Sequence, residues 1–546
     1  MVEAQREIEQ KYEAPTGCGT PQLPDLTCAP EVSVVVARGR VHLDAVYYDT
    51  ADGRLAADRI TLRRRTGGSD AGWHLKLPVS LAEGVRDEIR VPLEGAAQRP
   101  AGAGEPAEHD AGASAHGADA DPPKALPAPP PELAALVRSR VRHAPLVPVV
   151  RLRTIRRPYD LVGAGGVRLA EVSVDSVHAE RLGGPGAPED GAVRTTDWTE
   201  AEVELAEGGS RELLDRVGEQ VRAVGWRPSR APSKLSRALQ ETSADGTSPG
   251  SGPAAPAAPP VVAGAPAAAP VLDRLRAQRD ALVALDPAVR RGVPDAVHRM
   301  RVATRRARSV LRAYRGVLDR AATDPIAAEL RWLAAELGAD RDREVLTQRL
   351  TSGLDDLPAG LPAGPVRDRL RDWSRARHEQ ARRRLLAVLD GERYLALLDA
   401  LDELLSDPPL RAAATRPARP VLGTAVRRER RRLRRRLAEA LRRPPGADRD
   451  TALHEARKAA KRVRYAAEAA APVLGKRAAR TVSRAKRIQR LLGDHQDGVM
   501  ARDLLLDLAA EARAAGEDTF VYGLLYGREE QRAAHDAQLL RGVRRC

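Results

Sequence analysis

The chain has 546 residues, more than one hydrophobic core organises, so two or three domains are expected. Its net charge of +15 is unevenly spread: residues 271–546 carry 59 Lys and Arg against 38 Asp and Glu, and residues 1–270 carry 31 against 37. Bulk charge therefore favours polyanion binding by the C-terminal part alone. The three Cys form no Cys/His cluster, and no stretch is apolar enough for a signal core or a membrane span. We expect no zinc site, no membrane partner and a reduced, cytoplasmic setting.

The N-terminal part alternates apolar and polar residues in eight segments, which is the pattern of half-buried β-strands. A stretch of helical period, 210–224, follows the last of them. Eight such strands predict a closed or nearly closed antiparallel barrel. The eight segments are residues 6–13, 41–50, 59–66, 73–79, 86–93, 149–156, 168–177 and 200–207.

One face of these predicted strands carries charged side chains of both signs. Because side chains alternate along a strand, Glu7, Glu9 and Lys11 share a face. For any single strand, a solvent-exposed face is the ordinary interpretation. The repetition favours charged faces that point together into the barrel, where buried charges need partners or ligands. The other groups are Arg63 with Arg65, His74 with Lys76, Arg86 with Glu88, Arg151 with Arg153, and the row Glu200, Glu202 and Glu204.

A tunnel lined with charges of both signs predicts a ligand that also carries charges of both signs. Arg and Lys would hold phosphate oxygens, since guanidinium and ammonium groups suit them. Glutamates, as hard oxygen ligands, would hold Mg²⁺ or Mn²⁺. The charged faces therefore predict a metal–triphosphate site.

Two low-complexity stretches divide the chain. Residues 96–131 are rich in Ala, Gly, Asp and Pro, and we interpret them as a disordered insertion in the N-terminal domain. Residues 241–270 are a Pro/Ala-rich linker. The predicted domains are thus 1–240 and 271–546, and the second reads as helices throughout. The fold class is α+β and multidomain: an eight-stranded antiparallel barrel followed by an all-α duplicated bundle.

The helical part contains an internal duplication. His298 and Arg301 recur as His454 and Arg457, 156 residues later, and Leu337-Gly338 recurs as Leu492-Gly493. On a helix, the first copy places four side chains within about 80° of one stripe. Like charges so close destabilise an isolated helix. A solvated, Arg-rich face could explain one copy alone, but it explains two copies that keep the same register less well. We therefore predict an anion-binding face, formed by His298, Arg301, Arg305 and Arg308 and by His454, Arg457, Lys461 and Arg464.

The N-terminal part resembles the CYTH, or triphosphate tunnel metalloenzyme, family over about residues 1–240. The sequence Glu7-Ile8-Glu9-Gln10-Lys11 matches its ExExK signature, and LRRR, WHLKLP, RDEIRVPL, VRLRTIR, AEVSVDSV, EAEVEL and PSKLSRAL follow in the family's order. The resemblance implies an eight-stranded tunnel that binds a triphosphate and a divalent metal. It implies metal ligation by Glu7, Glu9, Glu202 and Glu204; phosphate binding by Lys11, Arg63, Arg65, Lys76, Arg151, Arg153 and Lys234; and catalytic roles for Lys11, Asp175 and Glu171.

The C-terminal part resembles the CHAD family over about residues 271–540. Four segments match in order, beginning with VHRMRVATRRARSVLRAY and LHEARKAAKRVRYAAEA in the two copies. The resemblance implies binding of inorganic polyphosphate by the two stripes and by Lys458, and association with polyphosphate granules.

Together these patterns predict metal-dependent hydrolysis of inorganic triphosphate or short polyphosphate, with longer polyphosphate held by the helices. One alternative is a polyphosphate-binding protein whose barrel is catalytically idle. Another is an organic triphosphatase or adenylate cyclase, although no purine-binding pocket can be recognised in the sequence. Nucleic-acid binding is disfavoured because an aromatic content of 3% leaves few stacking platforms. The oligomeric state is not determined by the sequence.

Overall fold

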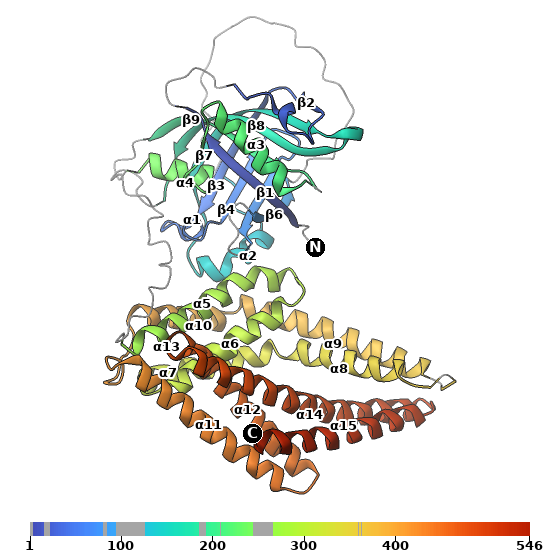
Figure 1. Ribbon diagram of the computed structural model, residues 1–546. Helices are drawn as coiled ribbons and strands as arrows, with labels where there is room; N and C mark the ends of the chain where they lie inside the picture. The colour runs from blue at the N-terminus through green and yellow to red at the C-terminus, as the bar shows by residue number, and fades with distance from the viewer. Residues whose placement is uncertain are drawn as a thin grey trace, which may run out of the picture. The chain divides into compact units, whose positions relative to one another are not determined.

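The computed structural model describes residues 4–15, 22–79, 85–93, 126–184, 193–207, 209–243, 266–358, 360–361 and 363–545. They belong to two compact units, Met1–Pro256 and Ala257–Cys546, which are treated separately (Figure 1). Most of the predicted insertion at 96–131 and of the predicted linker at 241–270 lies outside the described residues.

The N-terminal unit is built on a closed antiparallel barrel. Eight strands follow one another around it in the order β1-β6-β5-β4-β3-β7-β8-β9, and β9 pairs back with β1. Two further strands pair outside this ring, β2 with β7 and β10 with β1. The predicted eight-stranded barrel is confirmed, and each predicted segment supplies one of its strands. The strands are β1 Ala4–Glu13, β2 Val34–Ala37, β3 Val41–Asp49, β4 Thr61–Thr66, β5 Gly72–Pro78, β6 Val85–Pro92, β7 Val147–Val162, β8 Arg168–Arg181, β9 Thr195–Leu205 and β10 Arg227–Pro228.

Short helices cover the barrel and fill part of it. The helix expected at 210–224 is α3 (Arg211–Ala223), which begins after the N-cap Ser210 and buries its apolar stripe against β1 and β9. Helices α1 (Arg54–Ala57) and α2 (Pro131–Val141) pack together over the β4–β5 side. Helix α4 (Lys234–Glu241) inserts Leu235 and Leu239 among Val150, Leu152 and Trp198. Part of the barrel interior is therefore an apolar core closed by α4.

The C-terminal unit is helical throughout, as predicted. Its helices bury several clusters of Leu, Val and Ala side chains, and the largest cluster joins elements of both sequence copies. The helices are α5 Ala268–Arg290, α6 Ala296–Ala313, α7 Arg320–Glu336, α8 Ala339–Asp355, α9 Gly364–Asp390, α10 Glu392–Ser406, α11 Ala418–Arg442, α12 Ala447–Ala469, α13 Ala471–Leu474, α14 Lys476–Ala514 and α15 Phe520–Arg545. None of the helices in the described part of the chain is long and apolar enough to cross a membrane.

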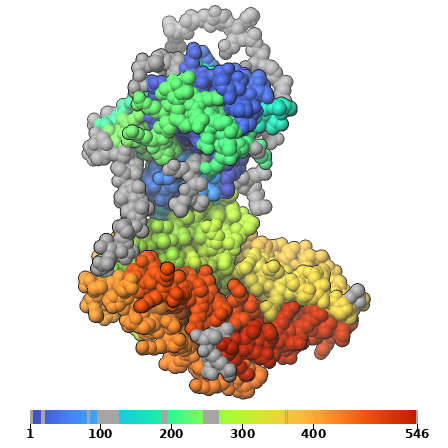
Figure 2. All heavy atoms as spheres, in the orientation of Figure 1, coloured from blue at the N-terminus to red at the C-terminus, as the bar shows by residue number. Residues whose placement is uncertain are grey.

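The duplication is visible in the helix order. Helices α5 and α6 of the first copy correspond to α11 and α12 of the second, and α6 packs against α12. The long helix α14 spans the stretch that α7 and α8 cover separately in the first copy. Figure 2 shows α8 and α9, in yellow, beside the red α14 and α15, and Leu350 and Leu505 lie in the apolar cluster that joins them. The two copies thus pack side by side and share apolar clusters.

Candidate active site and anion-binding cluster

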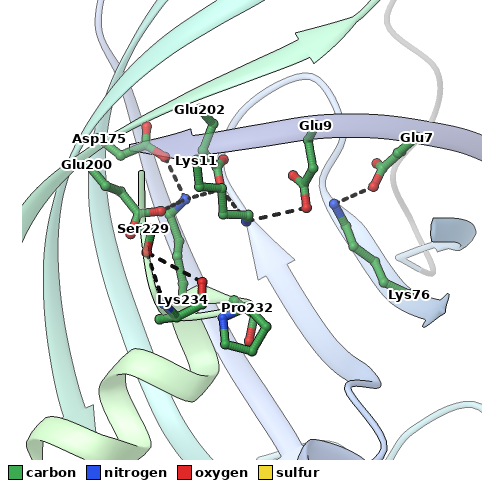
Figure 3. A network of polar contacts seen from close by, with 12 residues as sticks. Glu7, Glu9, Lys11, Lys76, Asp175, Glu200, Glu202, Ser229, Pro232 and Lys234 are labelled. Atoms are coloured by element: carbon green, nitrogen blue, oxygen red, sulfur yellow. Dashed lines mark hydrogen bonds and ion pairs between the residues drawn. The ribbon is translucent and has the colours of Figure 1, made fainter. Parts of the chain in front are cut away.

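The charged faces of β1 and β9 meet inside the barrel. Register pairs Lys11 with Glu202 and Glu9 with Glu204. Lys11 Nζ lies 2.5 Å from Glu202 Oε1 and 3.5 Å from Glu9 Oε1, and Figure 3 shows these side chains converging from their strands. Alternation along a strand, which predicts these faces from sequence, therefore brings their charges together.

Helix α4 carries Lys234 into a group of three carboxylates. Its first turn is fixed by the N-cap Ser233, whose hydroxyl accepts from the Ser236 backbone N–H. Lys234 Nζ lies 3.0 Å from Asp175, 2.6 Å from Glu200 and 2.7 Å from Glu202. Burial disfavours the ammonium, but the three carboxylates outweigh it and raise the pKa of Lys234, so the side chain stays charged.

A guanidinium from β7 completes this group. Arg156 Nη2 lies 2.7 Å from Asp175 Oδ2 and 2.8 Å from Glu202 Oε2. Register places Arg156 directly opposite Asp175, so both project to the same side of the β7–β8 pair. Although burial opposes ionisation of the carboxyl, Arg156 and Lys234 hold the pKa of Asp175 below its usual value.

A second group of charges lies around Glu88 on β6. Lys76 Nζ is 2.6 Å from Glu7 Oε2 and 3.8 Å from Glu88 Oε1, and His74 Nδ1 is 3.0 Å from the same Glu88 oxygen. Burial and the nearby carboxylates raise the pKa of Glu7 to about 7 despite Lys76. Burial likewise lowers the pKa of His74 to about 4, which keeps its ring neutral. Glu7 and Glu88 therefore share their cationic partners, Lys76 and Arg90.

Strand β4 adds two arginines to the interior. Arg63 donates to the Tyr47 hydroxyl at 3.2 Å and lies 3.8 Å from Glu88 Oε1. Arg65, almost fully buried, pairs with Asp70. Burial, with Arg63 and Arg156 nearby, lowers the pKa of Arg65 to about 9. Excess positive charge is therefore concentrated near β4, where an anion would relieve it.

The structure does not bring Arg151 and Arg153 into this interior. The alternate residues of β7, Val150 and Leu152, are the ones buried in the core beside α4, so the two arginines project from the opposite face. Arg151 pairs with Asp44 at 2.9 Å and Arg153 lies 3.8 Å from Glu180. The sequence-based placement of these two side chains in the tunnel is wrong, because the apolar alternate residues of β7 are the ones that face inward at that end.

The predicted acidic set is also distributed differently. Among the described residues, one set of three carboxylates offers oxygens that all lie within 4.8 Å of one another: Asp175, Glu200 and Glu202. Such oxygens suit a hard divalent cation, and the residues therefore fit Mg²⁺ or Mn²⁺. Of the predicted ligands Glu7, Glu9, Glu202 and Glu204, only Glu202 belongs to this set.

The remaining predicted acids lie around it. Burial raises the pKa of Glu204. Glu171 pairs with Arg168 at 2.5 Å and lies 4.0 Å from Arg156. It is therefore joined to Asp175 through a shared guanidinium rather than as a direct carboxylate pair.

Strand alternation placed His74, Glu88 and Glu200 on the charged faces, but sequence reasoning gave none of them a role in binding metal or substrate. It did not identify Arg156 at all, because Arg156 is out of phase with Arg151 and Arg153 on the same strand.

In the helical unit, part of the duplicated stripe forms one cluster. Arg301 and Arg305 on α6 and Arg457 and Lys461 on α12 influence one another across the α6–α12 contact. Burial, together with these guanidinium groups, lowers the pKa of Lys461 to about 6. Three guanidinium groups and a lysine in one place, partly buried, define a site that an external polyanion would neutralise.

The second echo of the duplication supports this cluster. Arg301 Nη1 lies 3.0 Å from Asp342 Oδ1, and the equivalent Arg457 Nη2 lies 3.8 Å from Asp497 Oδ1. A Cβ at Gly338 would lie 3.0 Å from Arg301 Nη2, so the repeated glycine leaves room for the guanidinium. The recurring Asp thus pairs with the first arginine of each copy.

Other members of the predicted set lie beside the cluster or pair with acids of their own. Lys458 pairs with Glu455 at 2.7 Å and is half-exposed, and Arg464 pairs with Glu468 at 2.8 Å. Arg308 is surrounded by further arginines of α6, α7 and α12. Burial and neighbouring cations lower the pKa of His298 and of His454, so neither ring is charged by default.

The closed barrel with an internal ion-pair network, followed by a duplicated basic helical unit, defines a tunnel domain joined to a basic helical domain. A CYTH domain model matches residues 5–225 and a CHAD domain model matches residues 273–506. Uncharacterized protein Rv2226 of Mycobacterium tuberculosis is 38% identical over 531 residues, which cover 96% of this chain and 92% of that protein. The chain therefore belongs to the family of proteins in which a CYTH domain precedes a CHAD domain.

Two solved structures each align with about half of the chain. PptA from Streptomyces chartreusis aligns over 52% of this chain and 100% of its own, at 21% identity and a TM-score of 0.43. The CHAD domain from the plant Ricinus communis aligns over 52% and 93%, at 25% identity and a TM-score of 0.40. CYTH domains are in general triphosphate tunnel metalloenzymes, and CYTH and CHAD domains are linked with triphosphate and polyphosphate binding.

Proposed function

We propose that the barrel hydrolyses a terminal phosphoanhydride of inorganic triphosphate or short polyphosphate, and that the helical unit binds longer polyphosphate. One observation carries the first part: five cations face carboxylates inside a closed barrel, with side chains at most 19% exposed. Burial of so many charges is costly unless partners or a ligand compensate it. The cations are Lys11, Arg63, Lys76, Arg156 and Lys234.

The positively and negatively charged side chains of the barrel would have different roles. Arg63, Lys76 and Arg156 would bind phosphate oxygens and stabilise the charge that spreads over the transferred phosphoryl group. Lys11 and Lys234, which now stand among the carboxylates, would exchange those oxygens for phosphate oxygens when substrate is bound. Preorganised cations in an enclosed site stabilise charge more strongly than in water.

Asp175, Glu200 and Glu202 would hold Mg²⁺ or Mn²⁺. When bound, the metal would neutralise phosphate oxygens and favour attack by water. Glu7 and Glu9 lie farther along the same interior and would contribute negative charge that balances the lysines.

The second part of the proposal rests on the cluster of Arg301, Arg305, Arg457 and Lys461. Its like charges are drawn from both sequence copies, so it suits a long polyanion that crosses from α6 to α12. Tethering the two units would raise the local concentration of phosphate chains near the barrel. Cytoplasmic polyphosphate granules are the location that such a ligand implies.

A substrate panel tests the proposal. Phosphate release is measured with triphosphate, long polyphosphate, ATP and thiamine triphosphate, each with Mg²⁺ and Mn²⁺, for the natural chain and for Lys11→Ala. We expect metal-dependent release from triphosphate that Lys11→Ala abolishes. Release from ATP above that from triphosphate would favour the organic triphosphatase alternative, and no release from any compound would leave a binding protein with an idle barrel.

A further inference from the structure

The helical unit contains a cleft between α11 and the first half of α14. Its volume is about 740 Å³, within the range of functional protein pockets. Both helices pack on α12, but they do not pack on each other along this stretch. The floor is apolar and includes Val426, Leu433 and Ile488, while the walls are arginines. The cleft is separate from the Arg301–Lys461 cluster, none of whose residues line it.

The arginines of this cleft have no acidic counterpart. No carboxylate lines it, and none of its seven arginines makes an ion pair with any residue that the structure describes. Arg436, on a neighbouring face of α11, differs, since it pairs with Glu455 at 2.7 Å. An apolar floor between unpaired guanidinium groups suits an occupant that is apolar on one side and acidic at its edges. The seven are Arg419, Arg427, Arg430 and Arg434 on α11 and Arg477, Arg480 and Arg484 on α14.

The duplication shows what fills the equivalent place in the first copy. There, α5 corresponds to α11, and α7 corresponds to the start of α14, since Lys476 follows Arg320 by 156 residues. Helix α10 packs against both α5 and α7, between two helices that do not pack on each other. In the second copy, α13 and α15 each contact both α11 and α14, but α13 reaches the cleft only with Leu474, and no described residue of α15 lines it.

Helix α10 is itself acidic and amphipathic. It buries Leu395, Leu398 and Leu401 in the core, and Asp402 pairs with Arg279 of α5 at 3.2 Å. Its sequence ERYLALLDALDELLS carries four acids and one arginine. The first copy thus shows, within the same chain, an acidic leucine-rich helix seated between the counterparts of α11 and α14.

We propose that the cleft between α11 and α14 is a docking site for an acidic, leucine-rich amphipathic helix of a partner polypeptide. The helix would lie as α10 lies in the first copy, with its leucines over Val426, Leu433 and Ile488. Its acids would pair with the arginines of the two walls, the usual arrangement for a helix bound in a groove. This site is independent of phosphate chemistry in the barrel.

The test uses the full chain and a fluorescein-labelled peptide with the sequence of residues 391–407. Fluorescence polarisation measures binding to the natural chain, to Arg434→Glu/Arg480→Glu, and to the control Arg435→Glu/Arg487→Glu. All four side chains are exposed, and only the first two line the cleft, so the pairs match in charge and in tolerance of folding. Circular dichroism checks that each variant keeps its helix content.

We expect saturable binding that weakens at least tenfold in the cleft variant and less than twofold in the control. The same peptide with serine in place of its leucines should not bind. Three results would overturn the proposal: no saturable binding, equal losses in both variants, or undiminished binding of the serine peptide. Loss of polyphosphate binding in the cleft variant, with the control unaffected, would instead assign these arginines to the polyphosphate surface.

Discussion

The barrel and the helical unit both gather cations, but they neutralise them differently. In the barrel nearly every buried cation already faces a carboxylate, as Lys234 faces Asp175, Glu200 and Glu202. In the helical cluster Arg301 and Arg457 pair with Asp342 and Asp497, yet burial and the neighbouring guanidinium groups still lower the pKa of Lys461 to about 6. The first arrangement suits a ligand that carries charges of both signs, such as a metal ion bound to a phosphate chain. The second suits a bare polyanion, which itself supplies the missing negative charge.

Metal removal separates the two regions most sharply. Treatment with EDTA should reduce phosphate release from triphosphate to background, because the carboxylate set in the barrel then lacks its divalent cation. Polyphosphate binding by the helical unit should change less than twofold. Phosphate release and polyphosphate affinity are measured in the same preparations, and restored Mg²⁺ should restore release. Comparable loss of both would show that the two regions share one metal-dependent site.

The inward arginine of β7 distinguishes the two faces of the barrel wall. Arg156→Ala should lower kcat for triphosphate by about 100-fold, the usual effect of removing one preorganised charge donor. Arg153→Ala is the matched control on the same strand and should leave kcat within about twofold, because Arg153 lies on the other face. Steady-state phosphate release gives both values. Equal losses would mean that the register of β7 does not decide which arginine binds substrate.

Individual arginines of the helical cluster should matter less. Arg305→Ala or Arg457→Ala should each weaken polyphosphate binding by about tenfold, since a hydrogen bond to a charged group contributes roughly 1.5–3 kcal/mol. Lys458→Ala should have little effect, because that side chain is exposed and paired with Glu455. Isothermal titration with polyphosphate measures all three. A loss with Lys458→Ala as large as with Arg305→Ala would contradict the cluster.

The smallest expected effect is proton uptake by Lys461. Its pKa of about 6 in the free protein lies below neutrality, so the amine is mostly neutral at pH 7.5. A bound polyanion favours the ammonium and raises this pKa, so binding should take up close to one proton near pH 7.5 and almost none at pH 5.

Titrations in buffers of different ionisation enthalpy measure this uptake. The lysine faces Arg301, Arg305 and Arg457 and one acid, Asp342. Lys461→Arg should bind polyphosphate without proton uptake. Uptake that persists in this variant would place the titrating group elsewhere.

The sequence alone determined the architecture of both units. Period-two alternation located all eight barrel strands, and the duplicated His and Arg positions located α6 and α12. These features are local, since the pleat of a strand and the turn of a helix fix which neighbours share a face. The ExExK signature likewise placed Glu9 and Lys11 on the face that β9 completes.

Tertiary structure decided which of those faces close on one another. Arg151 and Arg153 alternate along their strand just as Glu9 and Lys11 do. Helix α4, however, packs apolar side chains against Val150 and Leu152 inside the barrel, so the two arginines lie on the outer face of β7. The meeting of Lys234 with Asp175, Glu200 and Glu202 depends on a helix, α4, that inserts into the barrel from far along the chain. Alternation specifies a face but not what lies across from it, because pairing between distant segments is set by packing and register.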